Sequence, residues 1–140
     1  MVLSKLKEYE KLIADEPVEN AIIITKDGVI TRCFGNLNGV YPDVDLGEHL
    51  IGAYMTHNHP VGSDNEYSFS DLDIRLFMEY NLEVLRGIDE RYIYELTRNP
   101  EEIDKHLFLF EMTSYDSRHE NVISEAEKIG IGYRRYSHGS

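Results

Sequence analysis

The segment with the clearest chemical potential is His57-Asn58-His59-Pro60, in which one residue separates two histidines. In a β-strand alternate side chains point to the same face, so the two imidazoles can converge on one ion. Neutral imidazole binds zinc at about 2.0–2.1 Å, and a catalytic zinc has three protein ligands and an open position for water. The spacing therefore favours a zinc site, although a histidine pair on a surface strand would account for it equally well.

The natural third ligand is Asp73, in the segment Ser70-Asp71-Leu72-Asp73 at the start of the next expected helix. The N-terminus of a helix favours negative charge, which gives a carboxylate there a second reason to be ionised. The same four residues also fit a helix N-cap followed by an acidic residue at the third helical position, and capping alone would explain them.

The elements that must position these residues follow from hydrophobic spacing. Apolar residues recur at helical spacing from Leu3 to Ile13, and this helix is expected to end before Pro17. Strands are expected at 21–25, 29–34, 52–57, 83–88 and 92–97, with a tight turn at 26–28 and loops at 35–42 and 58–69. Further helices are expected around 46–50, at 71–80, and from the Asn99-Pro100 start to about Ile129. The pattern predicts one α/β domain with helices packed on a mixed sheet.

Composition limits the class of protein. The chain has 140 residues, of which 41% are hydrophobic and 29% charged, as in a folded domain. A net charge of −12 argues against binding nucleic acid, which needs clustered Lys and Arg. The single cysteine, Cys33, provides neither a disulfide nor a thiolate zinc site, and we interpret it as core packing.

No apolar run approaches the roughly 20 residues that span a bilayer, and the N-terminus lacks a signal-peptide core. We expect a cytoplasmic protein without a membrane partner, and the oligomeric state is not indicated.

Signatures of other chemistries are absent from the sequence. It contains no His-Glu-x-x-His motif, no zinc-deaminase motif, no phosphate-binding loop and no Gly-x-Ser-x-Gly nucleophile elbow. The other four histidines, His49, His106, His119 and His138, have no ligand spacing.

A strand ending in His-x-His, then a polar loop, then Ser-x-x-Asp at a helix start resembles the JAB/MPN superfamily, the JAMM zinc metalloproteases. The resemblance covers about residues 19–98, and the histidine segment is closer to the bacterial and phage branches than to eukaryotic deubiquitinases. It implies a JAB/MPN-like (cytidine-deaminase-like) α/β fold over residues 1–140, a mixed β-sheet flanked by helices. The core would lie at about 17–98, followed by a C-terminal helical extension at about 99–140.

The resemblance also implies a role for each site residue. His57, His59 and Asp73 would bind Zn²⁺, Glu19 would act as the general acid/base, and Ser70 would supply a hydroxyl on the oxyanion side. The implied reaction is cleavage of a peptide or isopeptide bond in a protein or peptide substrate by a zinc-activated water.

Two features leave alternatives open. The stretch from His59 to Ser70 is about three residues longer than is usual in the family, and the excess falls in loop 61–67, where insertions are tolerated. Ser68-x-x-Asp71 also satisfies the Ser-x-x-Asp pattern; we prefer Ser70 and Asp73 because the other register leaves Asp73 facing solvent. The alternative function is a JAB-like protein-binding or structural module without turnover, associated with phage or toxin modules.

Overall fold

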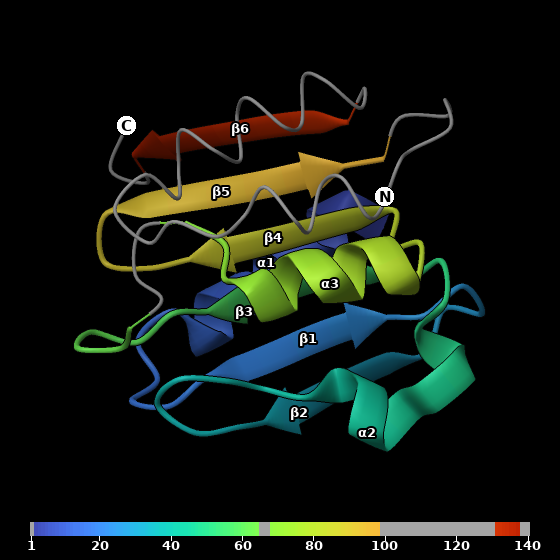
Figure 1. Cartoon of the computed structure of the whole chain (residues 1–140), viewed down its shortest axis with the longest axis horizontal. Helices are drawn as coiled ribbons and strands as arrows, with labels where there is room; N and C mark the ends of the chain where they lie inside the picture. Colours follow the sequence, from blue (N-terminus) through green and yellow to red (C-terminus); the bar gives the residue numbers. More distant parts are fainter. Residues whose placement is uncertain (1, 65–67, 99–130, 138–140) are drawn as a thin grey trace.

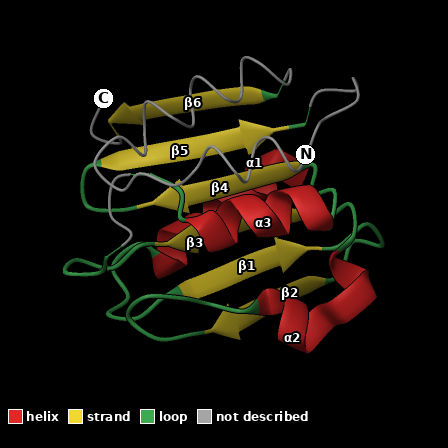
Figure 2. Ribbon diagram, viewed as in Figure 1, coloured by secondary structure: helices red, strands yellow, loops and turns green. Residues whose placement is uncertain are grey.

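The central feature is a six-stranded mixed sheet with strand order β2-β1-β3-β4-β5-β6 (Figures 1 and 2). The structure is a computed structural model that describes residues 2–64, 68–98 and 131–137. The strands are β1 Asn20–Ile24, β2 Ile30–Phe34, β3 Tyr54–Asn58, β4 Val84–Ile88, β5 Tyr92–Thr97 and β6 Gly132–Ser137. The helices in the described residues are α1 Val2–Ile13, α2 Pro42–Leu46 and α3 Asp71–Glu79, with a 3₁₀ turn, η1, at Gly47–Leu50. The expected α/β class with a mixed sheet is confirmed.

Helices α1 and α3 cover opposite faces of the sheet (Figure 1). Leu6 and Ile13 of α1 pack against Ile22 and Ile24 of β1, and all four are buried. On the other face α3 joins the larger core, whose buried members from the helix are Ile74, Leu76, Phe77 and Met78. Each large apolar side chain that is fully buried contributes about 1.5–3 kcal/mol. The alternation of side chains along β1 thus divides its residues between the two layers.

The chain connections bring the start of α3 next to the end of β3. Strand β1 is antiparallel to both β2 and β3, whereas β3 and β4 are parallel. A parallel pair needs a crossover that returns to the starting edge, and here the crossover contains α3. The last residues of β3 and the first turn of α3 therefore meet at one end of the sheet.

Two expectations need correction. The helical turn expected around 46–50 begins earlier, as α2, and continues as the 3₁₀ turn η1. Residues 132–137, placed in a helical extension, instead form the edge strand β6, which pairs antiparallel with β5. The segment Gly132-Tyr133-Arg134-Arg135-Tyr136-Ser137 has no apolar periodicity, so only pairing with β5 defines the strand. The helix expected at 99–129 lies outside the described residues. Among the described helices, none is long and apolar enough to cross a membrane.

Candidate metal centre

The site is built on one row of paired residues across the sheet. His57 of β3 pairs with Ala21 of β1 on one side and with Gly87 of β4 on the other. Gly87 in turn pairs with Tyr94 of β5. Directly paired residues project from the same face, which here is the face that α3 covers. Because the neighbours of His57 are the two smallest residue types, its imidazole has room within a packed layer.

The side chains of His57, His59 and Asp73 converge. The two Nε2 atoms lie 3.0 Å apart. Asp73 Oδ1 is 3.1 Å from His57 Nε2, and Asp73 Oδ2 is 3.2 Å from His59 Nε2. Tetrahedral ligands at about 2.0–2.1 Å from zinc lie about 3.3 Å from one another. The two imidazole nitrogens are therefore within a few tenths of an ångström of this spacing, and each faces a different oxygen of Asp73.

Glu19 belongs to the same cluster. It precedes Ala21 by two residues, so it faces the same side of the sheet, and its main chain is fixed by hydrogen bonds to Asn36 and Gly35, each 2.8 Å long. Ligand atoms of Glu19, His57 and His59 all lie within 4.8 Å of one another, and this buried group could hold a metal ion. Two carboxylates, Asp73 and Glu19, therefore lie close enough to the two histidines to be a third ligand.

The outer nitrogens of both imidazoles have hydrogen-bond partners that fix the rings. His57 Nδ1 lies 2.7 Å from the Arg86 carbonyl oxygen. A carbonyl only accepts, so Nδ1 of His57 donates and its Nε2 is turned toward Asp73. His59 Nδ1 lies 2.5 Å from the Tyr94 hydroxyl. Partners of this kind commonly orient metal-binding histidines.

The charges of the cluster are set by burial and by Asp73. Burial lowers the pKa of His57, but the charge and hydrogen bond of Asp73 outweigh it and raise the pKa to about 9. For Asp73, burial raises the pKa, but the facing histidines hold it well below its usual value. Burial lowers the pKa of His59 despite the opposing effect of Asp73. Without a metal ion, these three side chains at pH 7 are thus one imidazolium, His57, one carboxylate, Asp73, and one neutral imidazole, His59.

The start of α3 fixes the position of Asp73. Ser70 Oγ accepts a hydrogen bond from Asp73 N at 3.2 Å, and Asp73 Oδ2 accepts one from Ser70 N at 2.8 Å, which together form a capping box. Asp73 therefore caps the helix and contacts both histidines at once. In the other register, Asp71 is exposed and the Ser68 hydroxyl lies 3.2 Å from that of Tyr133. The structure brings Asp73, and not Asp71, to the histidines.

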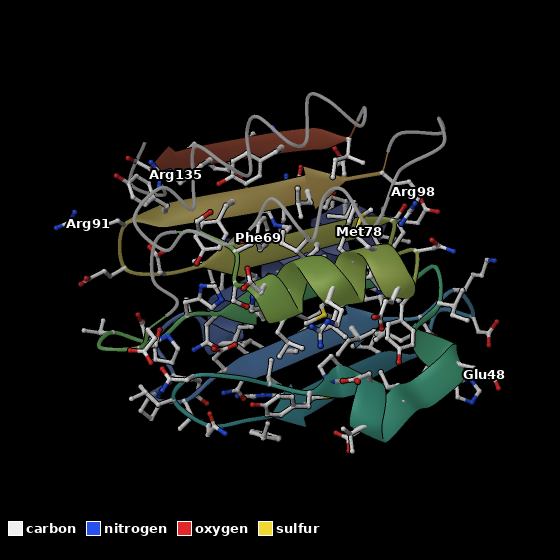
Figure 3. The ribbon with its side chains drawn as sticks, in the orientation of Figure 1. Glu48, Phe69, Met78, Arg91, Arg98 and Arg135 are labelled. Carbon is white, nitrogen blue, oxygen red and sulfur yellow. The ribbon has the colours of Figure 1, made fainter. Side chains whose placement is uncertain are left out.

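Aromatic rings form a wall of the site, and a pocket lies beside it. Phe69, labelled in Figure 3 between α3 and β5, stacks on His57 with ring centres 6.2 Å apart and packs edge-on against Tyr94 at 5.0 Å. A pocket of about 290 Å³ opens at the end of β3. It is lined by Ala14, Asp15, Glu16, Pro17, His59, Pro60, Val61 and Glu90. The cluster itself is buried, with His57 0%, His59 1%, Glu19 2% and Asp73 4% exposed.

Three residues of the site were not predicted from the sequence: Arg86, Gly87 and Tyr94. An isolated glycine inside a strand often marks a close approach by other atoms, so Gly87 within 83–88 carried a usable signal. The contact of Tyr94 with His59 depends on the register of three strands, and the Arg86 contact on a main-chain oxygen; neither leaves a pattern in the sequence.

Comparisons with protein-family models, with curated proteins and with solved structures found no match to this chain. The resemblance to the JAB/MPN superfamily therefore rests on the motif residues and remains a prediction. What the structure adds is a buried cluster of two histidines and two carboxylates on an α/β sheet.

Proposed function

We propose that this protein is a zinc-dependent metallohydrolase of the JAMM type that cleaves a peptide or isopeptide bond. His57, His59 and Asp73 hold the ion. The observation that carries the proposal is that the Nε2 atoms of His57 and His59 lie 3.0 Å apart, close to the spacing that tetrahedral zinc requires, with an Asp73 oxygen 3.1 Å from one and the other Asp73 oxygen 3.2 Å from the second. Two imidazoles and one carboxylate, with an open position, is also a ligand set found in catalytic zinc sites.

The remaining residues fit the needs of amide hydrolysis. A bound zinc ion would lower the pKa of a coordinated water to about 7 and polarise a substrate carbonyl. Glu19, within 4.8 Å of both histidines, accepts the proton of the attacking water and passes it to the leaving amine. The Ser70 hydroxyl uses a lone pair to cap α3, which leaves its own proton available for an oxyanion. The pocket beside His59 offers a path for a protein or peptide substrate.

A second candidate is a non-catalytic binding or structural module. Its support is that all four groups are at most 4% exposed and that the His57–Asp73 ion pair is satisfied without an ion. A buried ion pair of this kind holds β3 and α3 together irrespective of turnover.

Metal content and turnover together decide between the two. The protein is purified without chelator, its zinc is counted by elemental analysis, and a mixed library of linear and isopeptide-linked peptides is screened for cleavage by mass spectrometry. We expect one zinc per chain and a defined set of cleaved peptides. Less than about half an equivalent of zinc, or zinc without any cleavage, favours the binding module.

Substitution of the proposed base separates its role from metal binding. Glu19→Gln should retain zinc and lose cleavage, whereas Asp73→Asn should lose zinc. Glu8→Gln on the exposed face of α1 is the matched control and should change neither. Loss of zinc in Glu19→Gln would instead make Glu19 a ligand, and undiminished cleavage would remove it from the mechanism.

A further inference from the structure

The row of paired residues that crosses the sheet has no side chain at Gly87 of β4, directly beside the candidate metal centre. Gly87 lies between His57 of β3 and Tyr94 of β5 in register. A Cβ on Gly87 would overlap the Tyr94 ring and lie 2.8 Å from its Cδ2 atom. Because Gly87 has no side chain, the phenol ring can lie across β4, and its hydroxyl reaches His59 at the end of β3.

The hydroxyl of Tyr94 joins His59 to a carboxylate. It lies 2.5 Å from His59 Nδ1 and is fully buried. The same hydroxyl forms a hydrogen bond with the Asp89 side chain. Asp89 is itself fixed, because its Oδ1 accepts hydrogen bonds of 2.8 Å from the main-chain N–H groups of Arg91 and Tyr92. A carboxylate accepts, so Tyr94 donates to Asp89 and its oxygen is left to accept from His59 Nδ1–H.

We propose that Tyr94 is a positioning residue for metal binding, which holds His59 in the form that has its proton on Nδ1 and its Nε2 lone pair toward the ion. The inference rests on the proposed metal site. The Arg86 carbonyl does the same for His57 through a main-chain atom, which no substitution can remove. Tyr94 is therefore the one of these two partners that can be tested by mutation.

Tyr94→Phe is the informative change because it removes one oxygen and keeps the ring. The contact with Phe69, at 5.0 Å between ring centres, is preserved. His59 Nδ1–H would lose its partner inside the protein, and the imidazole would be free to turn or to move its proton to Nε2. Loss of such a partner commonly weakens metal affinity about 10- to 100-fold.

Zinc dissociation constants are measured by competition with a chromophoric chelator for the wild type, Tyr94→Phe and Tyr133→Phe. Tyr133 is the matched control: its ring packs on the same Phe69, with centres 6.0 Å apart, and its hydroxyl contacts Ser68 rather than His59. We expect affinity to fall about 10- to 100-fold in Tyr94→Phe and to be unchanged in Tyr133→Phe. In ¹⁵N–¹H spectra of the zinc-loaded protein, the slowly exchanging Nδ1–H signal of His59 should be present in the wild type and lost in Tyr94→Phe.

Failure of this inference is distinguishable from failure of the proposed function. If the wild type binds zinc and Tyr94→Phe binds it equally well, the role of Tyr94 is overturned and the metal site stands. If the wild type binds no zinc, both are overturned. Should Tyr94→Phe not fold, Gly87→Ala keeps the hydroxyl but displaces the ring. It should weaken zinc binding in the same way, and unchanged affinity there would also overturn the inference.

Discussion

The His57–Asp73 ion pair predicts a pH dependence that can be measured without knowing the substrate. Burial opposes the charged form of His57, but Asp73 reverses this and raises the pKa from 6.5 to about 9. A folded-state pKa above the unfolded value means that the imidazolium stabilises the fold. This stabilisation is fully present below pH 6.5 and is lost as the pH rises through about 9.

The size of the effect follows from the two pKa values. The difference, 9 − 6.5 = 2.5 units, corresponds at 1.36 kcal/mol per unit to about 3 kcal/mol. About 2 kcal/mol of this stabilisation is lost between pH 7 and pH 9, and the rest is lost below pH 7 and above pH 9. His59 and Asp73, whose pKa values lie below their usual ranges, hardly change protonation in this window in either state.

The assay is urea unfolding in the presence of a chelator at pH 7, 8 and 9, followed by circular dichroism. The metal-free wild type should lose about 2 kcal/mol of unfolding free energy across this range, and His57→Gln should lose much less. Other groups also titrate near pH 9. One is Cys33, because burial and Asp45 raise the pKa of its thiol from 9.0 to about 11 on folding. Such groups change the unfolding free energy equally in the wild type and in His57→Gln. An equally stable wild type at pH 7 and 9 would refute the ion pair and the charge assignment.

Two further predictions concern the same sheet. Zinc must displace the proton of His57, so binding at pH 7.5 should release about one proton per ion, measured by calorimetry in buffers of different ionisation heat; release of none would contradict a protonated His57. On the α1 face, Arg86 pairs with Glu10 at 2.9 Å and with Glu95 at 2.5 Å, and all three are buried. Arg86→Met leaves buried Glu10 without its cation and Glu95 with only the more exposed Arg134, and should cost about 3–5 kcal/mol in urea unfolding, whereas a cost below about 1 kcal/mol would show the network to be unimportant.

Much of the fold could be predicted because its signals are local. Leu6 and Ile13 share a helical face, and the apolar run Ala21 to Ile24 predicts a buried strand, as β1 is on both of its faces. Strand β6 could not be predicted in this way. Its residues are half-exposed or exposed, and its position depends on pairing with β5, which is about 35 residues earlier in the chain. Tertiary pairing, rather than local preference, decides such an edge strand.

The site residues differ in the same way: some follow from local sequence patterns, and others depend on tertiary contacts. The shared face of His57 and His59 follows from strand geometry, and the capping pattern placed Asp73 at the start of α3. Glu19 was suggested only by the resemblance, since a glutamate before a strand is unremarkable. The role of Tyr94 could not be predicted, because its side chain crosses the intervening strand β4 at Gly87 to reach His59. Sequence spacing therefore predicts ligands that are close along the chain, and misses the groups that orient them.

The most direct test of the central claim is X-ray absorption at the zinc edge on the protein loaded with one equivalent of zinc. We expect a four-coordinate ion with two imidazoles at about 2.0–2.1 Å and two oxygen ligands, one from Asp73 and one from water. The imidazole scattering should diminish in His59→Gln. A six-coordinate, oxygen-only environment without imidazole scattering would rule out the proposed site, because it would place the ion on surface carboxylates rather than between His57 and His59.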